Sequence, residues 1–151
     1  MLKKKENIKI ISNRHFFEEL ILFLNEGKKV LFTIKGNSMK PFICNGEKVL
    51  IRPYRSNELT LGTIVLAKYG NGVILHRIVS KKNEKILLAG DGNLWQREQI
   101  SSVEVLGIVD IVIRNNEWIK LDTSIKQLMA LCWYLIRPIR ILFYKINKLI
   151  N

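Results

Sequence analysis

The hydrophobic and polar residues of the chain follow three patterns in succession. Residues 14–26 place apolar side chains at helical spacing, Asn13 is a residue type that caps helix starts, and Gly27 is typical of a helix end. From Lys29 onward, apolar and polar residues alternate in short runs, as they do in half-buried strands. Helical spacing returns from Ser124. The pattern predicts an N-terminal helix, a β-rich middle and a C-terminal helix.

Turn-forming residues divide the middle of the chain into antiparallel strands. Gly70-Asn71-Gly72 separates TIVLAKY from VILHRIV, and Asn115-Asn116 separates the strand expected over 103–114 from EWIKL. Short strands joined by tight turns predict a mainly β fold, with a small antiparallel domain that resembles a closed or partly closed barrel and has flanking helices. The expected parts are a basic tail with the N-terminal helix (1–28), a β-rich domain (29–122) and a C-terminal amphipathic helix (123–151).

The C-terminal segment combines positive charge with apolar surface. Residues 123–151 contain five basic side chains and no acidic one, and Pro138 is expected to kink the helix. The longest uncharged apolar stretch, 128–136, is far shorter than the ~20 residues that a membrane-spanning helix needs. At 100° per residue, the polar side chains gather on one arc. These are Lys126, Arg137, Arg140, Asn147, Lys148 and Asn151.

This arrangement is typical of a helix that lies in a membrane interface with its basic residues toward the headgroups. We expect peripheral membrane association, on a side of the membrane that the sequence leaves open. Packing of the helix on its own barrel or on a second subunit is the alternative, and the oligomeric state is open.

The charge of the whole chain also favours a membrane surface as partner. The chain has 25 Lys and Arg against 13 Asp and Glu, which gives a formal net charge of +12 and favours phosphate-bearing partners. Because the charge collects at the two ends and is not interleaved with aromatic residues along the strands, we expect an anionic membrane surface and no nucleic acid. The sequence contains no metal cluster, phosphate-binding glycine loop or cofactor motif, so no metal or cofactor is expected. Cys44 and Cys132 are expected to be buried thiols.

Three segments carry candidate chemistry: KGNSMKPF (35–42), VILHRIVS (73–80) and LLAGDGNLWQRE (87–98). Ser38 lies in a turn, where its hydroxyl can stand clear of the sheet, and Met39 is expected to anchor that turn in apolar surface. His76 lies within a strand among apolar residues, which favour the neutral imidazole that a general base needs. Asp91 could hold that imidazole in the correct tautomer. Taken singly, the three segments are better explained as a polar loop, a core histidine and an Asp-Gly turn.

Together, the three segments resemble the sequence boxes of the signal peptidase I superfamily. Gly36-Asn37-Ser38-Met39-Lys40-Pro41 is similar to its serine box, Leu75-His76-Arg77-Ile78-Val79 to its second box, and Gly90-Asp91-Gly92-Asn93 to its Gly-Asp box. His76 stands where bacterial members carry lysine, as in the endoplasmic-reticulum-like branch. The resemblance implies Ser38 as nucleophile, His76 as base and Asp91 as the residue that orients the base. It also places Gly36, Asn37 and Met39 around the substrate and the oxyanion.

Two positions depart from the family pattern. Gly36 replaces a serine that often helps to form the oxyanion hole, and the second aspartate that often follows Gly-Asp is absent. Glu98 stands in that region, but we assign the orienting role to Asp91.

The resemblance implies a serine endopeptidase that cleaves a leader or signal-like peptide, with extended substrate added to the strand edge near residues 29–37. One alternative is an inactive relative that binds a leader peptide or a membrane partner. A less favoured alternative is a nucleic-acid-binding protein or a self-cleaving repressor.

Overall fold

The structure is a computed structural model that describes residues 13–150. The predicted basic tail before Asn13, and Asn151, lie outside the described residues. The helices are α1 (Asn13–Asn25), α2 (Ser124–Leu135) and α3 (Arg137–Ile150), with 3-10 turns η1 (Ser56–Glu58) and η2 (Ser102–Glu104). The strands are β1 (Val30–Thr33), β2 (Lys48–Arg52), β3 (Ile64–Tyr69), β4 (Gly72–Lys82), β5 (Lys85–Ala89), β6 (Glu98–Ser101), β7 (Val105–Arg114) and β8 (Glu117–Ile119).

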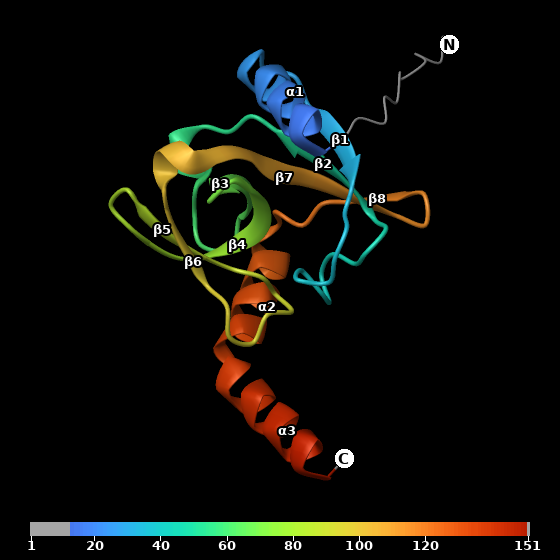
Figure 1. Ribbon diagram of the computed structural model, residues 1–151, viewed down its shortest axis with the longest axis vertical. Coiled ribbons are helices and arrows are strands. Elements are labelled where there is room, and N and C mark those ends of the chain that lie inside the picture. The colour runs from blue at the N-terminus through green and yellow to red at the C-terminus, as the bar shows by residue number, and fades with distance from the viewer. Residues whose placement is uncertain (1–12, 151) are drawn as a thin grey trace.

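All the strands belong to one antiparallel sheet that curls into a half-barrel (Figure 1). Its order is β1-β2-β7-β3-β4-β5-β6, with β8 paired to β7, so β1 and β6 lie at the two ends of the path. Register shifts in the β2–β7, β3–β7 and β4–β5 pairs mark irregularities of the kind that bend strands and increase twist. The predicted mainly β, barrel-like fold with flanking helices is confirmed.

The predicted turns are confirmed as well. The β3–β4 hairpin turns at Gly70, whose φ of 56° suits glycine, and Tyr69 pairs with Gly72. The β7–β8 hairpin turns at Asn115 and Asn116, which have φ of 50° and 66°. Tight two-residue hairpin turns require positive φ at consecutive positions, and asparagine tolerates that conformation.

One apolar cluster fixes the loop that connects β1 to β2. Leu20 and Leu24 of α1 join Val49 and Ile51 of β2 in this cluster. The loop contributes Met39, which is 2% exposed, and Ile43, which is fully buried. The expectation that Met39 anchors the turn is therefore confirmed, and the segment carrying Ser38 is held against the core by the residues next to it.

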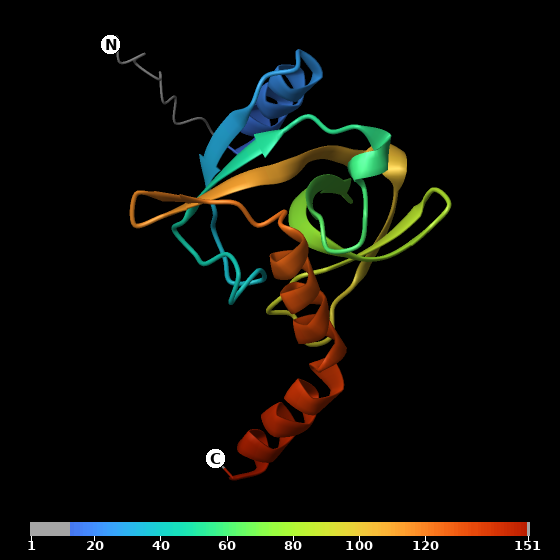
Figure 2. The same cartoon turned by 180° about the vertical axis from the view of Figure 1, so that it is seen from behind.

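The C-terminal segment forms two helices that differ in their surroundings. The break falls at Ile136, just before Arg137 and Pro138, close to the predicted kink. Figures 1 and 2 show α2 beginning beside the barrel and α3 projecting away from it. Within residues 13–150, no helix has the length and apolar character needed to cross a membrane.

Two sequence expectations about single residues are wrong. Arg137 was placed among the side chains that face lipid headgroups, but it is only 3% exposed because it reaches back to the loop before β6. The cysteines were expected to be buried, but Cys132 is exposed and Cys44 is half-buried; both are free thiols. In α2 the tertiary packing buries Ala130 and leaves Cys132 on the outer side.

Candidate active site

The loop that carries Ser38 is held by the loop between β5 and β6. The amide of Gly92 donates a hydrogen bond to the carbonyl oxygen of Ser38 at 2.7 Å. A Cβ atom on Gly92 would lie 2.7 Å from the carbonyl oxygen of Asn37, so only glycine allows this approach. The serine box and the Gly-Asp box, far apart in sequence, are therefore in direct contact.

Gly90 lies beside both the backbone of Ser38 and the imidazole of His76. A Cβ atom on Gly90 would lie 2.6 Å from the carbonyl oxygen of Ser38 and 3.0 Å from Nε2 of His76. The same point is 2.8 Å from Nδ2 of Asn93. Because all three atoms lie within 3.0 Å of one position, the structure brings Ser38, the imidazole of His76 and the amide of Asn93 together around a buried glycine.

His76 points its other ring nitrogen at a buried carboxylate. His76 lies on β4 and is 5% exposed; its Nδ1 is 2.8 Å from Oε2 of Glu98, the first residue of β6. Glu98 is 1% exposed. In the tautomer in which Nδ1 donates this hydrogen bond, Nε2 keeps its lone pair, and Nε2 lies near the same point as the carbonyl oxygen of Ser38.

Asp91 has a different partner from the one expected. Its two carboxylate oxygens accept hydrogen bonds from Nε and Nη2 of Arg77, each at 2.8 Å, and Arg77 also donates to the carbonyl oxygen of Gly62 at 2.6 Å. Burial raises the pKa of the Asp91 carboxyl, while its hydrogen bonds with Arg77 act in the opposite direction. The sequence assigned the hydrogen bond with His76 to Asp91, but Glu98 makes it, and Asp91 instead ties its loop to β4.

The C-terminal helices hold the same loop. Nε1 of Trp133 donates to the carbonyl oxygen of Asp91 at 2.9 Å, and the guanidinium of Arg137 donates to the carbonyl oxygens of Leu94 and Gln96. Burial lowers the pKa of Arg137, and the Glu98 carboxylate opposes that effect. The loop between Asp91 and Glu98 is therefore held in place by hydrogen bonds from α2 and α3.

Of the residues expected near the oxyanion, Gly36 has its amide already in use. The Gly36 amide donates to Oδ1 of Asn45 at 2.9 Å, and φ of Gly36 is 108°, a conformation that favours glycine. Asn37 is exposed, Ser38 is half-buried and Met39 is in the core. The amide of Ser38 donates no hydrogen bond within the described part of the chain, so it is a candidate donor to a substrate oxygen.

No role is assigned from the sequence to two residues of this cluster, Glu98 and Asn93. Glu98 shares the inward face of β6 with Ile100, and the alternation of that strand carries this signal: Glu98 and Ile100 are buried, whereas Gln99 is exposed. Asn93 belongs to the Gly-Asp box, but an asparagine after Gly-Asp-Gly is also typical of a plain turn. Only its closeness to His76 Nε2 and Ser38 distinguishes it.

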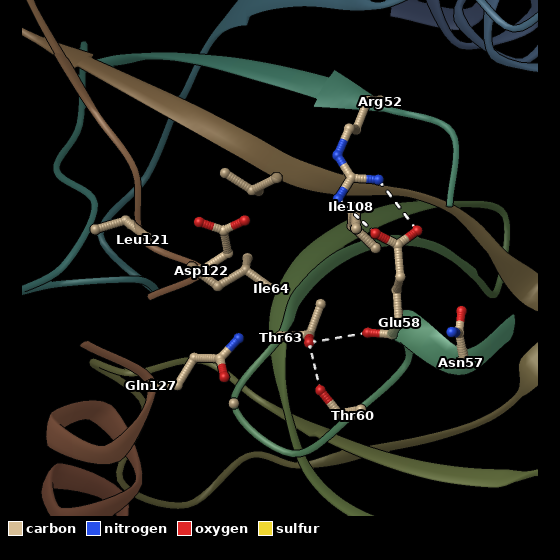
Figure 3. Close-up of a pocket in the computed structure, with 12 residues that line it drawn as sticks. Arg52, Asn57, Glu58, Thr60, Thr63, Ile64, Ile108, Leu121, Asp122 and Gln127 are labelled. Carbon is tan, nitrogen blue, oxygen red and sulfur yellow. Dashed lines mark hydrogen bonds and ion pairs between the residues drawn. The ribbon is translucent and has the colours of Figure 1, made fainter. Parts of the chain in front are cut away.

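A separate polar pocket of about 200 Å³ lies between the start of α2 and the barrel (Figure 3). Arg52, Glu58 and Thr63 line one part of it, with Asp122 and Gln127 facing them. None of the clustered residues around Gly90 lines this pocket. Within residues 13–150, no group of three or more His, Cys, Asp or Glu side chains is arranged to hold a metal ion.

Comparison with known proteins adds one finding to this geometry. No curated protein matches the chain. Residues 4–110 match the profile of the family described as Peptidase S24-like, which includes self-cleaving repressors and signal peptidase I. The matched range covers more than half of the chain and contains Ser38, His76, Asp91 and Glu98. The chain therefore belongs to the Peptidase S24-like family of serine peptidases and self-cleaving proteins.

Proposed function

We propose that the protein is a serine endopeptidase of the signal peptidase I type, which cleaves a leader or signal-like peptide supplied by another molecule. Ser38 is the nucleophile, His76 is the general base, and Glu98 orients His76. The proposal rests most directly on Gly90, where Nε2 of His76 and the backbone of Ser38 approach the same point while Nδ1 of His76 is bonded to Glu98.

In the proposed reaction, the hydroxyl oxygen of Ser38 forms a bond to the carbonyl carbon of the scissile peptide, and its proton moves to Nε2 of His76. The peptide C–N bond then breaks, and the leaving amine takes that proton. In the second half of the cycle, water attacks the acyl-serine ester and gives a proton to His76; the ester C–O bond then breaks, and His76 returns that proton to the Ser38 oxygen. The Glu98 carboxylate favours the imidazolium formed in each half, as the acid does in Ser-His-acid triads.

The sheet offers an edge for the substrate. β1 lies at the end of the strand order and leads through Ile34 and Lys35 into the turn of Ser38. An extended peptide added alongside this edge would run toward Ser38, with its backbone supplying the hydrogen bonds. The resemblance to signal peptidase I implies small residues one and three positions before the scissile bond.

A second candidate is a self-cleaving protein, because the same family includes proteins of that kind. A third is an inactive relative that binds a peptide. The third is favoured by Gly36, which offers no hydroxyl where many signal peptidases have one and whose amide is already bonded to Asn45.

Two assays on the full chain separate these candidates. Purified protein is incubated with a panel of leader-like peptides that carry small residues before the cleavage site, and both peptide and protein are followed by intact-mass spectrometry. We expect peptide cleavage at a rate proportional to enzyme concentration, retained in Ser80→Ala, which changes an exposed serine of β4, and lost in Ser38→Ala.

Cleavage of the chain itself, at a rate independent of protein concentration, would instead establish the self-cleaving function. Peptide binding without any cleavage in the wild type would establish the inactive relative.

A further inference from the structure

Helix α3 has two chemically distinct faces. One face repeats apolar side chains at the i, i+3, i+4 and i+7 spacing of a helical stripe. The stripe consists of Ile139, Leu142, Phe143, Ile146, Leu149 and Ile150. Every one of them is between 41% and 86% exposed. The apolar stripe is therefore left uncovered by the rest of the described chain, and α3 projects away from the barrel in both views (Figures 1 and 2).

The charged residues in the rest of α3 are all basic, and they lie there with Ile141, Tyr144 and Asn147. Lys145 lies at the border of the apolar stripe and Lys148 lies on the opposite side of the helix, both exposed. The segment from Thr123 onward contains no acidic residue. Arg140 stacks over the ring of Trp133, with its guanidinium carbon 4.1 Å from the ring centroid. An uncovered apolar stripe bordered by positive charge alone complements a surface that is apolar inside and negatively charged outside.

We propose that α3 docks on an anionic lipid bilayer, lying in the plane of its interface. The apolar stripe enters the boundary between headgroups and acyl chains. The Lys145 stem extends along that boundary and places its ammonium group among the phosphates, as long basic side chains do. At 1.5 Å per residue the helix is about 20 Å long, which suits a helix that lies on the bilayer surface.

The contacts at the start of α3 fix where the barrel sits relative to that surface. Arg137, the first residue of α3, is bonded to the carbonyl oxygens of Leu94 and Gln96, and Trp133 is bonded to the carbonyl oxygen of Asp91. The Arg137 bonds attach α3 to the loop between Asp91 and Glu98, and the Trp133 bond attaches the preceding helix, α2, to the same loop. Docking of α3 therefore holds the Ser38 and His76 side of the domain near the bilayer, where a membrane-bound substrate would be presented.

The test is sedimentation of the full chain with vesicles, a binding readout that does not depend on peptidase activity. Vesicles of phosphatidylcholine mixed with phosphatidylglycerol are compared with vesicles of phosphatidylcholine alone, at low and at high salt. We expect binding to the anionic vesicles, weaker binding at high salt and little binding to the neutral ones. Lys145→Gln/Lys148→Gln should weaken binding by roughly 25-fold, since each basic residue near an anionic surface contributes about fivefold.

Matched variants separate docking by α3 from attraction by the net charge of the protein. Lys82→Gln/Lys85→Gln removes the same charge from the exposed end of the β4–β5 hairpin and should leave binding within about twofold of the wild type. Phe143→Asp should abolish binding, whereas Val103→Asp, at an 84% exposed position of η2, should not. All four positions are exposed, so thermal melting is expected to stay near the wild-type value.

Equal binding by Phe143→Asp and the wild type would overturn the proposal. So would equal losses in the two lysine pairs. A dimer in sedimentation velocity that Phe143→Asp dissociates, together with no vesicle binding by the wild type, would assign the apolar stripe to a second copy of the chain and would also overturn it.

Discussion

The imidazole of His76 is bonded through Nδ1 to Oε2 of Glu98 at 2.8 Å, and both side chains are buried. The sequence favours Asp91 over Glu98 as the residue that orients His76, and this pairing reverses that choice. Glu98 orients the imidazole, while Asp91 neutralises Arg77 and anchors its loop. Substitution at the two positions should therefore produce different losses.

Glu98→Gln should reduce activity much more than stability. Glutamine can still accept the hydrogen bond from Nδ1, but it supplies no negative charge to the imidazolium that forms during the reaction. We expect activity to fall roughly 10²- to 10⁴-fold, with a loss in unfolding free energy below about 2 kcal/mol. Steady-state cleavage and urea denaturation measure the two quantities, and Glu117→Gln, at an exposed site, is the control. Unchanged activity would remove Glu98 from the mechanism.

Asp91→Ala should reduce stability more than activity. Removing the carboxylate leaves Arg77, which is 1% exposed, as an uncompensated buried charge. Breaking a buried ion pair in this way costs about 3–5 kcal/mol. Urea denaturation should show that loss, and folded protein at low temperature should keep more activity than Glu98→Gln. Wild-type stability in Asp91→Ala would contradict the assigned role.

Gly90→Ala tests the close approach of the Ser38 backbone and the His76 imidazole to Gly90. The added Cβ would lie 2.6 Å from a backbone oxygen, which cannot move without displacing the turn of Ser38. We expect a loss of about 1–3 kcal/mol in stability and a larger loss of activity, because the nucleophile and base are pushed apart. Gly72→Ala is the control, since no heavy atom lies within 4 Å of its Cβ position. Equal effects of the two substitutions would contradict the close approach at Gly90.

The Glu58–Arg52 pair in the pocket of Figure 3 should make stability depend on pH. The hydrogen bond from Arg52, together with one from the backbone amide of Arg55, lowers the pKa of Glu58 from 4.5 to about 2. A carboxyl whose pKa is lower in the folded state than in the unfolded state adds to the free energy of unfolding. That contribution is complete above the pKa of the unfolded state and is lost as the pH falls toward the pKa of the folded state. The stability advantage of wild type over Glu58→Gln should shrink between about pH 6 and about pH 2.5. Denaturation at both values measures it, and a constant difference would contradict the pair.

The sequence predicted the parts of the fold that local chemistry determines. Asn115 and Asn116 tolerate positive φ, so the β7–β8 turn follows from the residues themselves. Met39 is apolar beside a polar turn, and it is buried as its chemistry requires. The roles of Ser38 and His76 are expected only through the resemblance between sequence boxes.

Contacts between segments far apart in sequence determine the partners of His76, Asp91 and Arg137, and the sequence pattern does not predict them. The carboxylate that reaches His76 depends on the register of β5 with β6, where Leu88 pairs with Glu98. Asp91 lies only a few residues beyond the end of β5, and it is turned toward Arg77. The predicted position of Arg137 is wrong for a similar reason. Helical periodicity shows on which face of a helix a side chain lies, but it does not show that carbonyl groups of another loop accept hydrogen bonds from its guanidinium and bury it.

We claim that Ser38 is a nucleophile activated by His76. Reaction of the full chain with a fluorophosphonate probe, followed by mass spectrometry that locates the adduct, tests this role. We expect one adduct, on Ser38, lost in Ser38→Ala, strongly slowed in folded His76→Ala and retained in Ser80→Ala. Reaction of Ser38 at the wild-type rate in folded His76→Ala, or labelling of other serines in its place, would contradict the claim.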